Sequence, residues 1–374
     1  MANPFSDILS KFFPAQKATS VIGIDVGSSS VKVVQVKKKG GKAVLETYGE
    51  IALGPYAQTD LGRATILPAD KVSEAIKDLL REANTTTTDS GLSIPIGSSF
   101  IVFMKLPKSA EKNLAEMVPI EARKYIPVPV TEVSMDWWQV PHDESTVSEF
   151  QNGKAAPDDG MLEILLIVIT NDAIAKNKDI EKNSALATSF SEVEIFSTMR
   201  SVLEPGLAPQ MIIDFGAGST KVFVVEKGIL KASHVINRGA QDITLAISKS
   251  MNIPFADAEK MKRAQGITGT GANGVSILQV SSVTTDYIFA EIGRFVMDYY
   301  RKSGKKLSKI VLAGGGALLK GLPEKAKSSF DAPVEVADPF AKLEYPAFLE
   351  ATLHEAGPEF AVAIGIAVRK LQEL

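Results

Sequence analysis

Two short segments of the sequence carry a carboxylate, a glycine, small hydroxyl side chains and a lysine in the same order. One runs from Ile24 to Lys32 and reads IDVGSSSVK, and the other runs from Ile213 to Lys221 and reads IDFGAGSTK. A glycine in such a turn removes the Cβ atom and permits positive φ, so a phosphate oxygen can approach the backbone N–H groups. The repeated spacing therefore predicts two phosphate-binding turns.

The carboxylates and lysines of these segments predict the rest of a phosphate site. Asp25 and Asp214 each follow an apolar run, so we expect them to project from strand ends and to bind a hydrated Mg²⁺ largely through water. Lys32 or Lys221, on the outgoing strands, is expected to reach the β- or γ-phosphate. The predicted contacts are Asp25, Gly27, Ser28, Ser29, Ser30, Lys32, Asp214, Gly216, Ala217, Gly218, Ser219, Thr220 and Lys221. A single copy is better explained as an ordinary β-turn, but two copies in register favour a nucleotide site.

A run of three glycines forms a third candidate element. Gly314, Gly315 and Gly316 follow the strand-like run 309–313 and precede residues 317–319, which are expected to be helical. Glycines here would let a base and ribose lie against the backbone, but the same pattern occurs in a Rossmann turn or in close packing. The cluster does not have the spacing G-x-G-x-x-G, and no P-loop motif occurs, which disfavours dinucleotide and P-loop sites.

Composition excludes several classes of function. The 374 residues, 45% of them hydrophobic and 23% charged, predict a globular protein of two or three domains. The absence of cysteine and the three scattered histidines exclude thiol chemistry, disulfides and the usual zinc sites. A formal net charge of -3 supplies no basic surface for nucleic acid. The N-terminus lacks a signal-peptide pattern and the most apolar run, 161–170, is too short to span a membrane, so we expect a cytoplasmic protein.

The elements that must position these residues form an internal duplication. Each hairpin is predicted to be strand, turn, strand, with a second turn at 39–41 or 227–228, and helices are predicted at 194–203 and 360–367. With the later glycine cluster, this arrangement resembles the actin, Hsp70 and sugar-kinase superfamily from residue 21 onward. The resemblance implies an α/β, actin-like (ribonuclease H-like) duplicated fold, with two lobes around a cleft for ATP and Mg²⁺.

The resemblance adds further site residues. The segment AEKMK at 258–262 is similar to the A-E-x-x-K helix of this superfamily, which implies ribose and adenine contacts from Glu259 and Lys262. On spacing alone, the two residues are also explained as a solvated i,i+3 ion pair. Glu194, at the start of the first connecting helix, is the candidate for positioning the hydrolytic water, although an exposed glutamate is common at such a position. We therefore expect ATP binding with at most weak ATPase activity.

Within the superfamily, the run KYIPVP at 124–129 resembles the PilM family most closely. A helix predicted at 110–125 ends at this run, and a strand carrying Asp136 and Trp137 follows, as in the small α/β subdomain that this family inserts into its first half. The resemblance implies a scaffold of the type IV pilus assembly platform, cytoplasmic and peripheral to the inner membrane. It also implies that the protein holds the cytoplasmic N-terminus of a PilN-type membrane protein beside the inserted subdomain and contacts other platform components.

The chain is expected to divide along these elements. The expected parts are an N-terminal amphipathic segment (1–18), the first lobe (19–90), the inserted subdomain (91–183), the first connecting helix (184–210), the second lobe (211–358) and the last connecting helix (359–374). Four strands are expected in the insertion, near 92–95, 100–106, 133–140 and 161–170, with a polar hairpin loop at 142–160.

The N-terminal segment has an apolar stripe at helical spacing. Its residues are Phe5, Ile8, Leu9, Phe12 and Phe13. A membrane surface, a PilN-like partner and self-association compete for this stripe, and the small number of cations favours docking to protein.

Four other classes of protein share parts of this pattern. One is a polymerising cytoskeletal ATPase like FtsA or MreB. The FtsA type would carry a C-terminal amphipathic helix that attaches to the membrane, for which residues 369–374 leave little room. An Hsp70-type chaperone would need a substrate domain after the last helix. A sugar kinase would need a catalytic Asp in a sugar pocket. A type II secretion platform uses related components, and the sequence does not separate it from a type IV pilus platform.

Overall fold

The two Asp-Gly hairpins lie at equivalent places in two five-stranded sheets. The computed structural model describes residues 20–141, 160–271 and 274–373. The first sheet has the order β3-β2-β1-β4-β8 and the second has the order β11-β10-β9-β12-β13. The first comprises β1 (Ser20–Val26), β2 (Ser30–Lys39), β3 (Lys42–Ala52), β4 (Asp89–Ile94) and β8 (Ala187–Val193). The second comprises β9 (Gln210–Phe215), β10 (Thr220–Glu226), β11 (Ile229–Ile236), β12 (Lys309–Ala313) and β13 (Val334–Val336). Because the two orders correspond strand for strand, the predicted duplication is confirmed.

The pairing register brings each aspartate beside a lysine. In the antiparallel pair β1–β2, Asp25 lies opposite Lys32, and in the pair β9–β10, Asp214 lies opposite Lys221. Each central strand also pairs in parallel with a later strand, β1 with β4 and β9 with β12. Directly opposed residues have Cβ atoms roughly 5 Å apart. The seven-residue spacing in the sequence therefore makes the two side chains neighbours in both lobes.

The helices of the first lobe pack on its sheet in two pairs. They are α2 (Ala69–Glu82), α4 (Asn171–Ser184), α5 (Glu194–Val202) and α11 (Ala361–Gln372). Helix α2 packs against α4, and α11 packs against both α5 and β1. A Cβ atom on Gly365 would lie 1.9 Å from the carbonyl oxygen of Ser197 in α5, and one on Gly23 would lie 1.9 Å from that of Ala363. These two glycines let α11 cross its neighbours at backbone contact.

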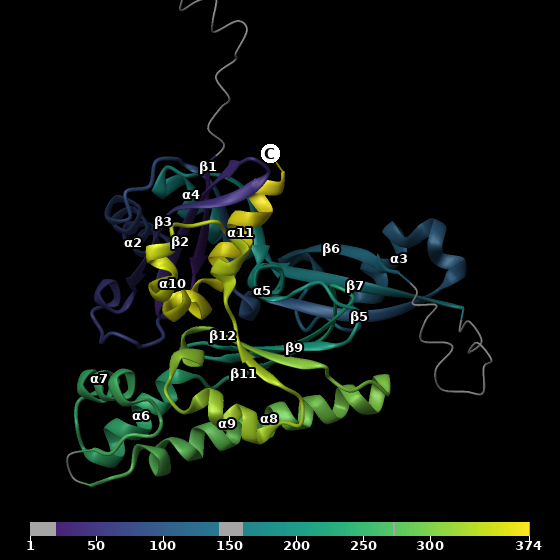
Figure 1. The fold of residues 1–374 in the computed structure, drawn as a ribbon. Coiled ribbons are helices and arrows are strands. Elements are labelled where there is room, and N and C mark those ends of the chain that lie inside the picture. Colours follow the sequence, from purple (N-terminus) through teal and green to yellow (C-terminus); the bar gives the residue numbers. More distant parts are fainter. Residues whose placement is uncertain (1–19, 142–159, 272–273, 374) are drawn as a thin grey trace, which may run out of the picture.

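The second sheet forms the core of the lower lobe in Figure 1. Its helices are α6 (Ala240–Met251), α7 (Phe255–Gln265), α8 (Ile277–Ser303) and α9 (Leu322–Ser329). Apolar residues of β9, β10 and β12 pack with those of α6, α8 and α9, for example Ile213 and Leu312 with Ile243 and Ile288. The chain then returns to the upper lobe, where Leu353 of α10 (Glu350–Ala356) joins the core around β1 and β2.

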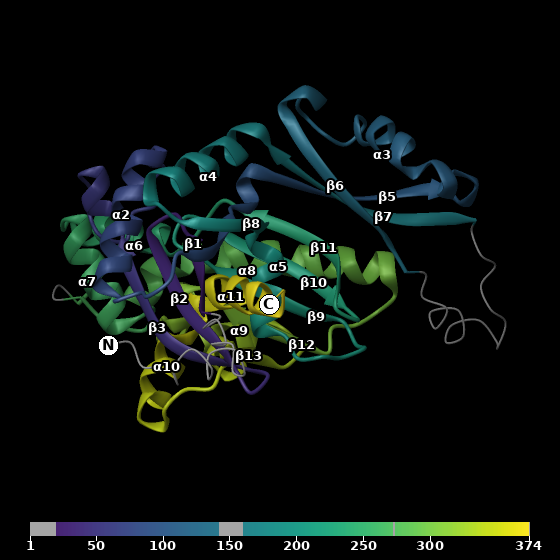
Figure 2. The same ribbon diagram turned by 90° about the horizontal axis from the view of Figure 1, so that it is seen from above.

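A smaller unit projects to one side of the lobes, as Figures 1 and 2 show. It contains a three-stranded sheet of order β5-β7-β6 and a helix, with β5 (Ser99–Pro107), β6 (Val133–Val140), β7 (Met161–Thr170) and α3 (Leu114–Ala122). Along β7, Ile164 and Leu166 face α3, whereas Leu165 and Ile167 join a cluster with strands of the lower lobe. Burial on both faces explains the unbroken apolar run of this strand.

This unit is narrower than the predicted insertion of 91–183. The strand expected at 92–95 is β4, which pairs with β1 and β8 in the first sheet. Helix α4, which lies within the predicted insertion, packs on α2 of the upper lobe. The sequence pattern identified the elements but not the sheet to which each belongs, because strand pairing depends on residues distant in the chain.

Two predicted helices also differ. Residues 108–113 form a 3₁₀ turn and α3 ends at Ala122, so the helix expected at 110–125 is shorter, and it contains Pro119, which lacks an N–H donor. After the glycine cluster a single 3₁₀ turn, Gly315–Leu318, replaces the expected helix, and α9 begins only at Leu322.

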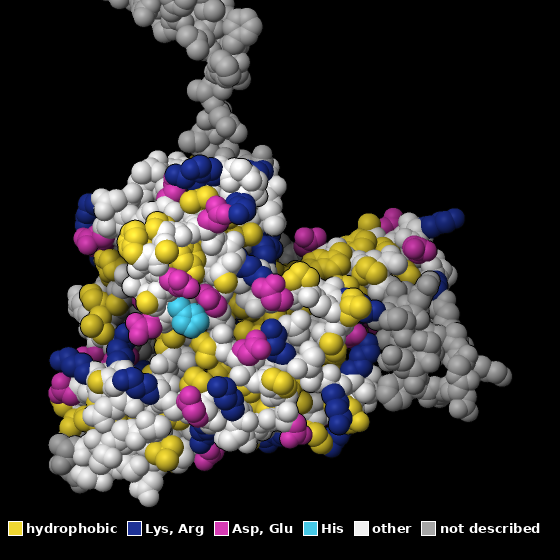
Figure 3. Space-filling model, in the orientation of Figure 1, with side chains coloured by type: hydrophobic (Ala, Val, Ile, Leu, Met, Phe, Trp, Pro, Cys, Tyr) yellow, Lys and Arg dark blue, Asp and Glu magenta, His cyan; other side chains and the backbone are white. Residues whose placement is uncertain are grey.

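On the face seen in Figure 3, acidic and basic side chains are interspersed. Among the described residues, none of the helices combines the length and apolar character needed to cross a membrane. The predicted amphipathic segment 1–18 and most of the polar loop 142–160 lie outside the described residues.

Candidate functional site

A cleft of about 300 Å³ lies between the two lobes, and most of the predicted site residues line it. Those that do are Asp25, Gly27, Ser28, Ser29, Ser30, Lys32, Glu194, Asp214, Gly216, Ala217, Lys221, Glu259, Lys262, Gly314, Gly315 and Gly316. Three predicted contacts, Gly218, Ser219 and Thr220, are not among the lining residues. Segments almost two hundred residues apart in the chain therefore meet in one site.

Both hairpin turns have the same construction. The amide of Gly27 donates to the carbonyl of Ser30 at 3.0 Å, and the amide of Gly216 donates to that of Ser219 at 3.0 Å. Among the described residues, the amides of the two residues that follow each glycine donate to no other protein group. Free amides in a tight turn form an anion-binding concavity, so both turns fit phosphate.

The three residues outside the lining have other roles. The side chain of Thr220 is fully buried and donates to the carbonyl of Arg238 at 2.9 Å. Ser219 supplies the carbonyl that closes its turn. A Cβ on Gly218 would lie 3.0 Å from Cβ of Ala64 and 3.4 Å from Oγ of Ser28, so this glycine lies against the upper lobe at the mouth of the cleft. The side chains of Ser219 and Thr220 therefore do not line the cleft, whereas the amide of Gly218 belongs to the turn itself.

Carboxylates on the walls of the cleft hold both lysines. Lys221 Nζ donates to Glu194 Oε2 at 2.7 Å and to Asp214 Oδ2 at 3.1 Å. Burial opposes the charge of Lys221, but these carboxylates outweigh burial and raise its pKa. Lys32 Nζ lies 2.9 Å from Glu50 and donates to Ser30 Oγ at 2.7 Å. Both ammonium groups are therefore charged and fixed at the edge of the phosphate turns.

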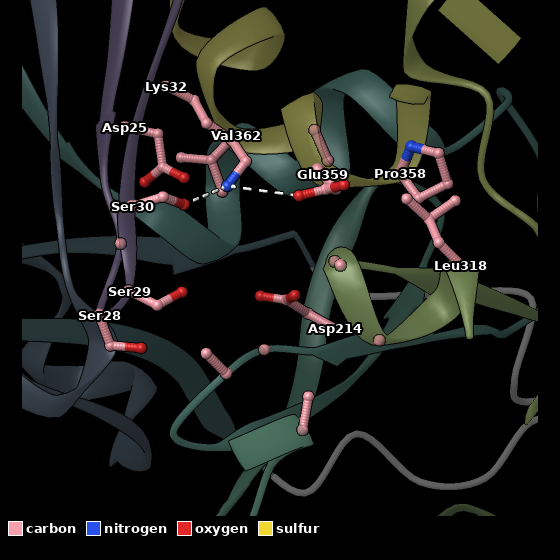
Figure 4. A pocket seen from close by; sticks show the side chains of 18 of the residues that line it. Asp25, Ser28, Ser29, Ser30, Lys32, Asp214, Leu318, Pro358, Glu359 and Val362 are labelled. Atoms are coloured by element: carbon pink, nitrogen blue, oxygen red, sulfur yellow. Dashed lines mark hydrogen bonds and ion pairs between the residues drawn. The ribbon is translucent and has the colours of Figure 1, made fainter. Parts of the chain in front are cut away.

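Asp25 and Asp214 supply the acidic groups of the cleft. In Figure 4 their carboxylates and the hydroxyl of Ser29 point into the same space. Both aspartates are only 8% exposed. Burial, together with the charge of Glu194, raises the pKa of Asp25 to about 6 against the opposing effect of the lysines and a hydrogen bond to Ser93. An unliganded Asp25 is thus costly to ionise, and a cation beside it would relieve that cost.

The donor set fits a hydrated Mg²⁺. Within the described residues no three His, Asp or Glu side chains cluster as ligands for one ion. Mg²⁺ usually keeps several waters and binds through one or two carboxylates plus phosphate oxygens. Asp25 and Asp214 beside two phosphate-type turns match that requirement.

The pair Glu259–Lys262 is buried, so its interpretation as a solvated surface pair is wrong. Each residue is 4% exposed, and Lys262 Nζ lies 2.7 Å from Glu259 Oε2. Glu259 also accepts hydrogen bonds from Thr244 Oγ1 at 2.6 Å and Arg263 Nε at 2.8 Å. Burial disfavours its charge, but these three donors outweigh burial and keep the pKa of Glu259 below its usual range.

Glu194 is also buried, at 7% exposure, rather than exposed at its helix start. Its Oε1 accepts the backbone N–H of Ile96 at 2.8 Å, and its Oε2 accepts Lys221 Nζ. Both carboxylate oxygens are therefore engaged within the protein.

Two glycines of the cluster 314–316 pack closely against β9, and the third faces the cleft. Gly314 has a φ of +78°, and a Cβ there would lie 2.3 Å from Asp214 Oδ1. A Cβ on Gly316 would lie 2.1 Å from the ring of Phe215. Only Gly315 faces more open space, with Glu359 Oε2 at 3.4 Å from its ideal Cβ. Close packing against β9 therefore explains two of the three glycines.

Several cleft residues were missed by the sequence analysis, notably Glu50, Gly62, Arg263 and Glu359. Glu50 lies opposite Lys32 in the β2–β3 register, which was the available signal. Gly62 has a φ of +85° and lies against Glu259 of the other lobe. Nothing in its local sequence indicates that contact.

Residues 23–371 match the family described as type IV pilus assembly protein PilM. The chain belongs to the PilM family. This PilM-family chain is also similar, at 25% identity and a TM-score of 0.76, to a solved PilM–PilN type IV pilus biogenesis complex, with 94% of this chain and 98% of that one covered.

This PilM-family chain is also similar to cell division proteins named FtsA and to an MreB5 structure. FtsA of Enterococcus faecalis is 25% identical over 357 residues, covering 86% of this chain and 79% of FtsA. FtsA of Neisseria meningitidis serogroup B is 31% identical over 148 residues, and the match spans about a third of each, 34% of this chain and 36% of that FtsA. MreB5 of Spiroplasma citri bound to AMPPNP is 12% identical with a TM-score of 0.51, covering 95% and 97% of the two chains, which shows the fold alone. The predicted two-lobed actin-like fold is confirmed.

Proposed function

We propose that this PilM-family chain is an ATP-binding scaffold of the type IV pilus assembly platform that holds the N-terminal segment of a PilN-type membrane protein. The observation that carries the proposal is the cleft, where two turns with available amides lie beside two buried carboxylates. Family membership supports the pilus platform, and the relative solved as a PilM–PilN complex supports the partner.

In this proposal the residues of the cleft divide the nucleotide between them. The amides after Gly27 and Gly216 bind phosphate oxygens, and Asp25 and Asp214 hold the water shell of Mg²⁺. When bound, Mg²⁺ neutralises phosphate charge. The buried Glu259–Lys262 pair and the glycine cluster form the wall for adenosine. A solved MreB5 bound to AMPPNP supports a nucleotide in this fold.

ATP acts in this proposal mainly as a ligand that favours the closed arrangement of the lobes. A ligand shifts an equilibrium by its differential affinity for the two states. A loop of the upper lobe already contacts the lower one, since the amide of Ala64 donates to Gln241 Oε1 at 3.0 Å and Arg63 lies 4.3 Å from the ring centroid of Phe255. Glu194 positions a hydrolytic water only if Lys221 releases one of its oxygens, so hydrolysis is slow at most.

The partner peptide is proposed to bind at the inserted subdomain. Strand β6 is an edge strand of its sheet, and Trp138 on this strand is 37% exposed. Edge strands accept extended peptides by strand addition. Binding the cytoplasmic N-terminus of a PilN-type protein there would keep this chain in the cytoplasm, peripheral to the inner membrane and beside other platform components.

The nucleotide part is tested by calorimetry. MgATP is titrated into the wild type, Asp214→Asn and Asp331→Asn, the last being a matched change at an exposed position of the lower lobe. We expect binding to the wild type and the Asp331 variant, and affinity at least tenfold lower in Asp214→Asn or when Mg²⁺ is chelated. Equal affinity in all three proteins would remove the assigned site.

A second candidate is a polymerising FtsA-like protein, which the similarity to Enterococcus faecalis FtsA over 86% of the chain favours. Light scattering separates the two. Filament growth on adding MgATP would support the polymer, whereas the scaffold proposal predicts a constant signal.

A further inference from the structure

Glu194 joins three parts of the molecule. It begins α5 in the upper lobe, its Oε2 accepts Lys221 of the lower lobe at 2.7 Å, and its Oε1 accepts the N–H of Ile96 at 2.8 Å. Ile96 begins the short turn from which β5 leaves for the inserted subdomain. One buried carboxylate thus contacts both lobes and the root of the insertion.

The first turn of α5 contacts the inserted sheet a second time. Phe196, two residues after Glu194, packs edge-on against Trp138 of β6, with ring centroids 5.7 Å apart and an interplanar angle of 62°. Ile195 lies in the cluster that contains Leu165 and Ile167 of β7. A shift of this helix turn therefore moves groups in contact with two of the three inserted strands.

The other side of the carboxylate opens on the phosphate turns. Lys221 has three N–H donors, and two of them are used by Glu194 and Asp214. A phosphate bound at the turn after Gly216 is a stronger acceptor for the same ammonium group, because phosphate carries more charge than one carboxylate. The phosphate takes the third N–H first and, as the stronger acceptor, pulls Lys221 toward its turn and lengthens the contact with Glu194.

We infer that Glu194 is a positioning residue that couples the nucleotide cleft to the inserted subdomain. MgATP draws Lys221 away from Glu194, the carboxylate rearranges against the turn at Ile96, and the inserted sheet shifts relative to the lobes. The inference rests on the proposed nucleotide function and deepens it, since it assigns the route by which ATP changes the peptide-binding surface. Coupling of this kind is reciprocal, so the peptide alters MgATP affinity by the same factor.

The chain contains a built-in reporter for this route. Its only tryptophans, Trp137 and Trp138, both lie on β6, and neither lines the cleft. Tryptophan emission therefore reports on the inserted subdomain, and calorimetry reports nucleotide binding independently. The wild type is expected to change its emission on adding MgATP.

The test compares this signal in Glu194→Gln, which keeps an acceptor for the Ile96 amide but loses the charge that holds Lys221. This variant should still bind MgATP but lose at least four-fifths of the emission change. The affinity of a PilN-type peptide, which MgATP should change about fivefold or more in the wild type, should become independent of MgATP. Glu204→Gln is the matched control, because Glu204 lies beyond the C-terminal end of α5 and pairs with Lys342 instead of a cleft residue.

Each outcome decides the inference. The inference is overturned if Glu194→Gln shows the full emission change. It is also overturned if the wild type binds MgATP by calorimetry without any change in emission. The proposed function survives both results. Absence of MgATP binding overturns function and inference together. If Glu194→Gln does not fold, Phe196→Leu serves instead: it removes the ring contact with Trp138 and should bind MgATP with a reduced emission change, and an undiminished change contradicts the inference.

Discussion

Replacing Asp25 by asparagine should stabilise the unliganded protein and abolish the proposed binding of MgATP. The pKa of Asp25 is raised from 3.8 to about 6, so the folded protein holds a proton that the unfolded chain has released. Stability from this group is fully present below pH 3.8 and is lost as the pH rises to 6. The shift corresponds to about 3 kcal/mol at pH 8, and roughly half of that at pH 5. Asparagine has no charge to bury and avoids this cost.

The assay is urea denaturation of the wild type and Asp25→Asn at both pH values. The variant's stability advantage should be larger at pH 8 than at pH 5 by about 1.5 kcal/mol, and taking the difference between proteins removes the pH dependence of groups that do not interact with Asp25. Asp331→Asn, at an exposed position, should show no such widening. An advantage that is the same at both pH values would refute the reasoning that burial of the Asp25 charge is costly. MgATP binding should be lost in Asp25→Asn at both pH values.

Three further substitutions test the packing of the cleft and the helix crossing. Gly314→Ala places a Cβ atom in a backbone conformation that only glycine readily adopts, which costs about 1–3 kcal/mol before any clash. The variant should bind MgATP more weakly in calorimetry, and unchanged affinity would contradict this expectation. Glu259→Gln leaves Lys262 buried without its counter-ion, so the free energy of unfolding measured in urea should fall by about 3 kcal/mol. The control Glu344→Gln removes an exposed ion pair and should lower it by less than about 1 kcal/mol. Gly365→Ala should force α11 from α5 and cost about 1–3 kcal/mol by thermal unfolding, and an unchanged Tm would show that the crossing adapts.

The sequence was sufficient to predict the duplicated hairpins, because their chemistry and their pairing are both local. The spacing of Asp25 from Lys32, and of Asp214 from Lys221, determines that these residues are opposed once each hairpin forms. The helix predicted at 360–367 is also local in origin, and it contains Gly365, at which α11 crosses α5.

Features that depend on contacts between lobes could not be predicted. Gly62 and Glu259 meet across the cleft, and Glu359 approaches Lys32 at 3.8 Å although more than three hundred residues separate them. The predicted boundary at residue 91 was wrong for a similar reason, since β4 pairs with β1 through a parallel connection. Burial of the Glu259–Lys262 pair followed from the position of α7 against α6, which its own i,i+3 spacing does not determine.

Titrating a synthetic PilN-type N-terminal peptide into the MgATP-saturated protein in a calorimeter shows whether the protein is a nucleotide-loaded scaffold for a PilN-type partner. A scrambled peptide of the same composition is the control. We predict saturable one-to-one binding of the native peptide and none of the scrambled one. A folded, MgATP-loaded protein that binds neither peptide would contradict it.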